Sequence, residues 1–168
     1  MPVDDIEIEK EIDTVEGLFD KLIETIEEAK DIPILYIVDS LDALTDKAEK
    51  ERKIDEGSFA MNKQKKLSEI FRRIVKDIEK SNMCLIIISQ IRDKVGVMFG
   101  EKHSRSGGKA LDFYASQIIW LTELGKIQKT IKGIKRPIGI SIKAKAKKNK
   151  VSAPYRDCEF DIIFSYVS

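Results

Sequence analysis

Apolar residues recur at helical spacing in two stretches of the first half of the chain. The first begins after Asp13 or Thr14, either of which can cap a helix. The second predicts a long amphipathic helix over roughly Ala60–Glu79. The apolar positions expected on the buried faces of these helices are Val15, Leu18, Phe19, Leu22, Ile23, Ile26, Leu67, Ile70, Phe71, Ile74, Val75 and Ile78.

Two continuous apolar runs, Ile34–Val38 and Met83–Ser89, have the length of strands. Because a continuous run is typical of a strand covered on both sides, we expect Ile34–Val38 to be buried on both faces. Ile6 and Ile8 alternate with charged residues and predict a short edge strand. Strands that alternate with helices indicate a parallel α/β sheet.

The second half of the chain has the pattern of antiparallel strands. One strand is expected over Gln117–Leu124, a second through Ile138–Ile142 toward Lys147, and a last one over Glu159–Tyr166. A single helical turn at Ala110–Tyr114 precedes them. The predicted architecture is therefore a parallel α/β part followed by an antiparallel strand meander.

The composition, 42% hydrophobic and 35% charged over 168 residues, is that of a soluble globular domain. Its apolar runs are too short to span a bilayer, and we expect a cytoplasmic protein without a membrane partner. Cys84 and Cys158 fall on predicted strands without metal-ligand spacing and are expected to be buried, reduced thiols. His103 is the only histidine, which excludes a histidine-rich metal site.

The net charge is only +1, but the charges are unevenly distributed. Acidic residues dominate Asp4–Asp31, whereas Lys126–Arg156 holds many lysines and arginines and no acidic residue. Such asymmetry indicates contact with phosphates or with an acidic partner, or else a solvated lysine-rich surface.

Polar residues follow the two central strands. Asp39 ends the first strand, where a carboxylate can hold Mg²⁺ through a water molecule; alternatively it caps the segment that follows. Gln90 ends the second, where its amide can bond a terminal phosphate and lose that bond after hydrolysis, or is simply an exposed polar residue. The loop that cradles triphosphates, G-x-x-x-x-G-K-[ST], does not occur in the sequence.

Two basic segments could bind nucleic acid. The loop Ile91–Gly108 combines basic residues, glycines and apolar residues such as Met98 and Phe99, which can wedge between bases or tuck against the core. In Lys143–Lys150, lysines at the end of a strand could reach a phosphate, including one on a neighbouring subunit. The alternative is an edge strand that its lysines protect from aggregation.

In order and spacing, these segments resemble the bacterial RecA recombinase family, from about Thr14 to Phe164. The strongest similarities are in I-V-D-S-L-D-A-L-T-D-K-A-E, S-Q-I-R-D-K-V-G-V-M-F-G, G-G-K-A-L-D-F-Y-A-S and K-N-K-V-S-A-P. The resemblance implies a partial RecA-type (P-loop NTPase-like) core over 1–168, with an α/β part at 1–124 and an antiparallel β part at 125–168. It also implies binding of single-stranded DNA, ATP at subunit interfaces, DNA strand exchange and repair, and a filament with itself or with a full-length recombinase.

The resemblance assigns roles by position. Asp39, with Ser40 beside it, would support Mg²⁺, and Gln90 would be the γ-phosphate sensor that serves catalysis. Lys148 and Lys150 would reach ATP across the filament interface, and Met98 and Phe99 would lie in a communication segment. The DNA-binding loops would be about Glu56–Lys65 and Lys94–Lys109. Residues matching DNA-contacting positions are Lys65, Ser68, Arg72, Arg92, Lys94, Val95, Gly107, Gly108 and Lys109.

The chain also departs from the family pattern. The oligomerisation helix, triphosphate loop and catalytic glutamate would precede Met1, a further domain would follow Ser168, and Asn62, Lys63, Gln64 and Lys66 replace small apolar residues. The strand that feeds the triphosphate loop would lie between the strands at Leu85–Gln90 and Ile118–Leu121. Three arrangements would account for the missing strand. The two strands pair directly, another chain fills the gap between them, or the protein is longer than this sequence.

Two functions follow from these expectations. The first is the C-terminal part of a recombinase core, which would not hydrolyse ATP alone because phosphoryl transfer depends on the positioning loop. The second is a DNA-binding or filament-modulating module that works without nucleotide. An inactive remnant is a third possibility.

Overall fold

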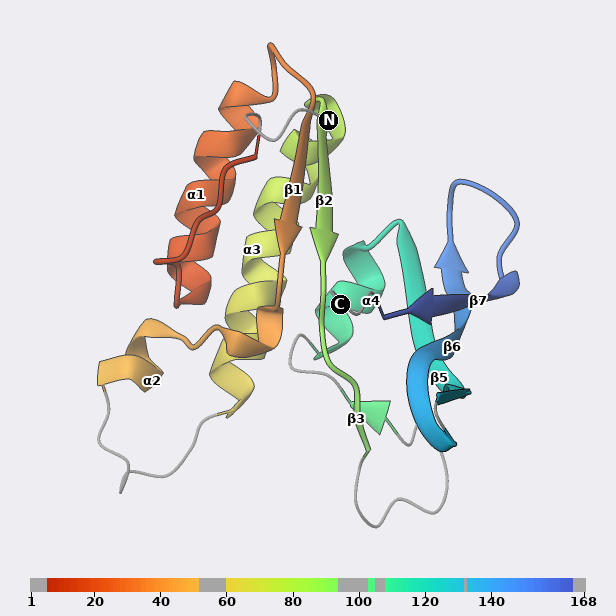
Figure 1. Ribbon diagram of the computed structural model, residues 1–168. Helices are drawn as coiled ribbons and strands as arrows, with labels where there is room; N and C mark the ends of the chain where they lie inside the picture. The colour runs from red at the N-terminus through yellow and green to blue at the C-terminus, as the bar shows by residue number, and fades with distance from the viewer. Residues whose placement is uncertain (1–5, 52–59, 94–102, 105–107, 132, 165–168) are drawn as a thin grey trace. The chain divides into compact units, whose positions relative to one another are not determined.

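The computed structural model describes residues 6–51, 60–93, 103–104, 108–131 and 133–164 (Figure 1). The chain divides into two compact units, Met1–Tyr114 and Ala115–Ser168. The first contains the helices and a parallel strand pair, and the second is an antiparallel sheet.

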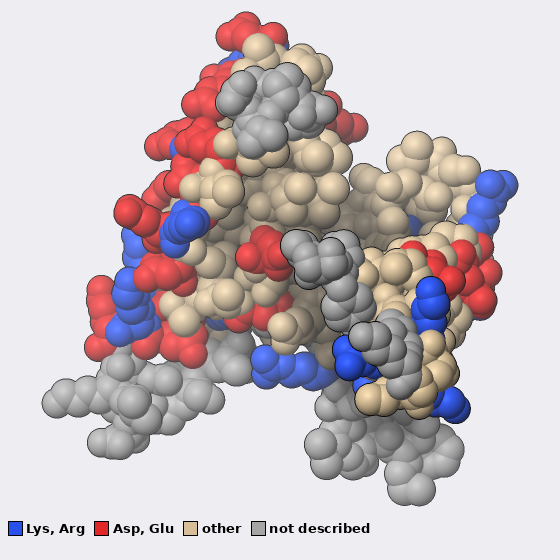
Figure 2. All heavy atoms as spheres, in the orientation of Figure 1, with Lys and Arg blue, Asp and Glu red and all other residues tan. Residues whose placement is uncertain are grey.

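Helix α1 (Val15–Glu28) begins where the sequence predicts. The side-chain oxygen of Thr14 accepts a hydrogen bond from the backbone N–H of Gly17 at 3.1 Å, which satisfies one free donor of the first turn. The predicted apolar face is largely buried, although Ile23 is 39% exposed. Most acidic residues of α1, namely Asp20, Glu24, Glu27 and Glu28, are exposed, and Figure 2 shows carboxylates gathered over this helix.

Strands β1 (Ile34–Val38) and β2 (Met83–Ile87) pair in parallel, with Ile34 opposite Met83 and Val38 opposite Ile87. Helix α3 (Ala60–Lys80) connects them and, with α1, packs on one face of the pair (Figure 1). The predicted parallel α/β arrangement and the long second helix are confirmed. Between β1 and α3 lie a 3₁₀ turn (η2, Leu41–Ala43) and the short helix α2 (Lys47–Glu51).

The prediction that Ile34–Val38 is buried on both faces is wrong. Leu35 and Ile37 are 54% and 53% exposed, and Ile86 on β2 is 44% exposed. Both packed helices lie on the same side of the strand pair, so every second side chain points away from the core. Cys84 shares that outer face and is exposed, which corrects the expectation of a buried thiol.

The expected edge strand at Ile6 and Ile8 is also absent. The described residues 6–13 form no strand, and both isoleucines are more than half exposed. Alternation with charges cannot produce a strand where no neighbouring strand supplies hydrogen bonds. Thr14 alone forms an isolated parallel bridge with Thr45.

After β2, the two-residue strands β3 (Arg92–Asp93) and β4 (His103–Ser104) pair antiparallel, and α4 (Gly108–Tyr114) follows. In the second unit, β5 (Gln117–Ile131), β6 (Ile134–Asn149) and β7 (Asp157–Ile163) form the predicted meander. Strand β5 continues through Gly125, where a register shift lets it follow β6. Cys158 on β7 is exposed, again contrary to expectation, because all of β7 is exposed.

The described strands form three separate sheets, β1–β2, β3–β4 and β5–β6–β7. In the part of the chain that the structure describes, no helix combines the length and the apolar composition that a membrane crossing requires.

Candidate functional site

The carboxyl ends of β1 and β2 meet at one edge of the parallel pair. Asp39 follows β1 and is exposed, and Gln90 lies shortly after the end of β2 and is also exposed. The backbone N–H of Ile88 donates to the carbonyl of Val38 at 2.9 Å, so the segments that follow β1 and β2 remain hydrogen-bonded beyond the last strand pair. Ligands of parallel α/β sheets bind at this type of edge.

An additional residue, Asp42, reaches Gln90. Its Oδ2 accepts a hydrogen bond from the backbone N–H of Gln90 at 2.7 Å. The backbone N–H of Leu41 donates to the carbonyl of Ile88 at 3.0 Å, which ties the same turn to β2. Sequence reasoning missed Asp42, because nothing in its spacing distinguishes it from an ordinary acidic residue in a charged segment.

Ser40 and Ser89 lie beside the two candidate residues. The side chain of Ser40 does not cap the turn η2 that it precedes. The side-chain oxygen of Ser89 is buried and has no hydrogen-bond partner among the described residues. Within the described part of the chain, this hydroxyl therefore stays available for a hydrogen bond at the strand edge.

Helix α3 presents Lys65, Ser68 and Arg72 as one stripe. The spacing of three and four residues places them on the same side of the helix, and Lys65 and Arg72 are exposed. The opposite side of α3 is buried through Leu67, Phe71 and Ile74. Three of the residues predicted to contact DNA therefore lie on one side of α3, away from the face that the core buries.

Two further predicted contacts lie at the start of α4, which packs against α3. Gly108 lies beside the side chain of Gln64, and the rings of Phe71 and Tyr114 are 6.2 Å apart between centroids. Lys109 is exposed. Arg92 lies in β3, opposite Ser104 of β4. Lys94, Val95 and Gly107, together with Met98 and Phe99, fall outside the described residues.

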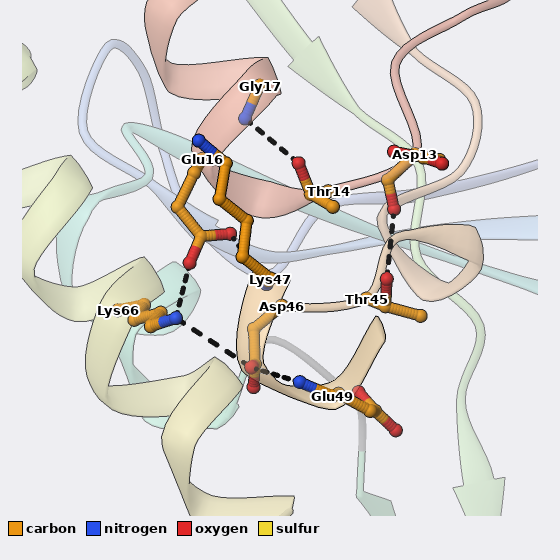
Figure 3. A network of polar contacts seen from close by, with 9 residues as sticks. All are labelled: Asp13, Thr14, Glu16, Gly17, Thr45, Asp46, Lys47, Glu49 and Lys66. Carbon is orange, nitrogen blue, oxygen red and sulfur yellow. Dashed lines mark hydrogen bonds and ion pairs between the residues drawn. The ribbon is translucent and has the colours of Figure 1, made fainter. Parts of the chain in front are cut away.

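Polar contacts fix the segment between β1 and α3 to both helices (Figure 3). Lys66 donates to Oε1 of Glu16, and its Nζ lies 3.7 Å from Oδ1 of the buried Asp46. Asp46 also caps α2 by accepting the backbone N–H of Glu49 at 2.9 Å. Lysine at position 66, a departure from the family pattern, thus serves as a structural clamp.

The pKa values of this pair shift in opposite directions. Burial favours a higher pKa for Glu16, but hydrogen bonds from Lys66 and from backbone N–H groups, including that of Lys47, outweigh it and lower the pKa. The hydrogen bond to Glu16 raises the pKa of Lys66 against the effect of burial. Each group therefore stabilises the charged form of the other.

Lys63, another departure, lies on α3 but points toward the turn after β1. Its Nζ donates to the carbonyl of Leu41 at 2.9 Å and also to the carbonyl of Leu44. Burial lowers the pKa of Lys63, while Asp42, Glu49 and Asp46 act in the opposite direction. The turn that carries Asp42 is thus held from α3.

In the second unit, Lys148 and Lys150 flank Asn149 at the end of β6. The Oδ1 of Asn149 accepts the backbone N–H groups of Val151 at 3.0 Å and Ser152 at 3.1 Å, which fixes the turn that follows. Burial, followed by the charge of Lys150, lowers the pKa of Lys148. Two neighbouring ammonium groups of this kind favour a bound anion.

Other lysines of β6 have local partners. Lys143 lies 3.2 Å from Asp157 and 3.5 Å from Glu159, both on β7, and Lys147 lies over the ring of Trp120 at 4.4 Å. These lysines are therefore part of the sheet surface itself. The interpretation of Lys143–Lys150 as an edge strand protected by its lysines is wrong, because β6 lies between β5 and β7.

The described residues could hold a magnesium ion only together with water and phosphate ligands. The described residues contain no group of three or more His, Cys, Asp or Glu side chains that could hold a metal. Asp39 supplies one exposed carboxylate at the strand edge. Mg²⁺ keeps several waters and takes phosphate oxygens as ligands, so one carboxylate is compatible with a nucleotide-borne ion.

Comparison with known proteins gives one consistent family. The model of the RecA N-terminal domain matches residues 6–167. Protein RecA of Allochromatium vinosum is 41% identical over 130 residues, which are 77% of this chain and 36% of that protein. Protein RecA 2 of Myxococcus xanthus is 40% identical over 131 residues, 77% of this chain and 35% of that protein. The chain thus spans about a third of the length of these relatives.

Proposed function

The chain belongs to the RecA family, and we propose that it is the C-terminal part of a RecA-like ATPase core that binds single-stranded DNA. In the complete assembly this part would serve homologous recombination, strand exchange and repair. The proposal rests mainly on α3, whose stripe of the exposed Lys65 and Arg72 and the half-buried Ser68 adjoins the start of α4 with Gly108 and Lys109.

This arrangement suits a single strand for physical reasons. Cations on a rigid helix can contact successive phosphates without a sequence preference. Glycine at the start of α4 allows its backbone to lie close to the side chain of Gln64 on α3, which keeps the start of α4, with Lys109, near α3. The helix itself is anchored by its buried face and by Lys66, so binding would not require it to fold first.

The nucleotide would be bound by groups at the strand edge. Asp39, beside Ser40, would hold Mg²⁺ through water, and Gln90 would sense the γ-phosphate. Lys148 and Lys150 would contact ATP of a neighbouring subunit, either of this protein or of a full-length recombinase. ATP with Mg²⁺ would supply the terminal phosphate to which the Gln90 amide would bond, and that bond would be lost after hydrolysis. Because this sequence lacks the triphosphate loop, we expect no ATP hydrolysis by these residues alone.

A salt titration of DNA binding tests the proposal. The 168-residue protein is titrated with a fluorescent single-stranded oligothymidylate at several salt concentrations. Binding whose affinity falls with salt is expected, with a log–log slope of about −0.7 for each phosphate neutralised. A duplex of the same length is the comparison. Lack of binding to the single strand at low salt would refute the proposal.

A further inference from the structure

The turn after β1 contacts both the strand end that carries Gln90 and the helix that carries the candidate DNA-binding stripe. On the first side, Oδ2 of Asp42 accepts the backbone N–H of Gln90 at 2.7 Å. This is a short hydrogen bond with a charged acceptor, a class stronger than bonds between neutral groups. It fixes the position of the Gln90 backbone, from which the side-chain amide extends.

On the other side, the turn is held from α3. Nζ of Lys63 donates to the carbonyl of Leu41 at 2.9 Å and to that of Leu44, the residues that bracket Asp42. Asp42 also favours the charged form of Lys63 electrostatically. The ammonium group is thus the point at which α3 holds the turn.

The turn cannot move independently of the end of β2. The backbone N–H of Leu41 donates to the carbonyl of Ile88 at 3.0 Å, and that of Ile88 donates to Val38 at 2.9 Å. With the bond between Asp42 and Gln90, three hydrogen bonds join this edge. A displacement of α3 that carries Lys63 along would therefore be transmitted to Gln90.

We propose that Lys63 and Asp42 are positioning residues that connect α3, through the turn Leu41–Leu44, to Gln90. Resting on the proposed function, the inference means that DNA on the stripe of Lys65, Ser68 and Arg72 changes the placement of the phosphate-sensing amide. The coupling is reciprocal: a phosphate bound at Gln90 changes DNA affinity by the same factor. Asp42 acts on Gln90 through the backbone N–H of Gln90, and Lys63 acts on it through the carbonyls of the turn.

The test follows the backbone amide resonance of Gln90 by NMR. The variants are K63M, which keeps the aliphatic stem but removes the ammonium, D42N, which keeps a carbonyl acceptor, and D42A. Matched controls are K30M and D20N, on exposed positions near and in α1. In the free protein, K63M and D42A should shift the Gln90 resonance, D42N should shift it less than D42A, and the controls should leave it in place.

A second measurement adds a single-stranded oligothymidylate. In the wild type and the controls, the oligonucleotide should shift the Gln90 amide; in K63M and D42A this response should be lost, while the amides of α3 still respond. An equal Gln90 response in all variants would overturn the inference and leave DNA binding intact. If the wild type binds no oligonucleotide, the proposed function fails. The connection from Lys63 to Gln90 is then judged from the free protein alone, and an unchanged Gln90 resonance in K63M would overturn it.

Discussion

A Cβ atom placed on Gly108 would lie 3.0 Å from Oε1 of Gln64, and Gly108 adopts φ +56°. A larger residue at this position therefore has two separate costs, the contact with Gln64 and the left-handed backbone conformation. The contact can be relieved, because Gln64 is the end of a flexible side chain, whereas the left-handed backbone conformation cannot.

We expect G108A to destabilise the protein by about 1–2 kcal/mol, mainly through the backbone. Urea unfolding of G108A and of the double variant Q64A/G108A measures both parts: Q64A should recover only a minor share. G125A is the control, because Gly125 has open space around a would-be Cβ and an ordinary φ. Full recovery in the double variant would show that the contact, and not the backbone, sets the cost.

The N-terminus of α1 depends on the hydrogen bond from Gly17 to Thr14. Removing the side-chain oxygen in T14A should reduce the free energy of unfolding by about 1 kcal/mol, as for other N-cap residues. T14S keeps the oxygen and should retain most of the stability. Equal loss in both variants, measured by urea unfolding, would assign the effect to the buried methyl group instead of the cap.

The sequence pattern was sufficient for α1, α3, the parallel pair and the antiparallel meander, because periodicity and capping are local signals. It was not sufficient for burial. The run Ile34–Val38 suggested cover on both faces, but whether a helix packs on Leu35 and Ile37 depends on chain elsewhere. The candidate residues Asp39 and Gln90 follow strand ends and were found by position. Asp42 and Lys63 were missed, since their partners are distant in sequence and are main-chain groups.

The ion pair between Glu16 and Lys66 should make the free energy of unfolding decrease at acidic pH. The pKa of Glu16 is lowered from 4.5 in the folded protein, so its contribution is fully present above that value and is lost as the pH falls through the lower folded pKa. The difference in unfolding free energy between wild type and E16Q should therefore shrink below pH 4.5. E28Q, on an exposed position of α1, is the control. A constant difference at all pH values would show that the charge of Glu16 does not matter.

Cys84 and Cys158 are both exposed and free. A thiol reagent such as Ellman's reagent should modify both in the native protein, with no need for denaturant. The variants C84S and C158S assign each step. Reaction of Cys84 only after unfolding would indicate that another polypeptide covers the outer face of β1 and β2, a face on which Leu35, Ile37 and Ile86 are exposed.

The stripe on α3 makes the most direct prediction about nucleic acid. Each cation that contacts a phosphate releases counterions, so K65A/R72A should weaken oligothymidylate binding and make the salt slope shallower by about 1.4, twice the 0.7 of one contact on single strands. K65R/R72K keeps both charges and should retain the slope. K30A removes a cation from the exposed pair with Glu27 and should leave both affinity and slope unchanged. Circular dichroism confirms that each variant is folded. An unaltered slope in folded K65A/R72A would mean that the strand follows another surface, because loss of a phosphate contact cannot leave counterion release unchanged.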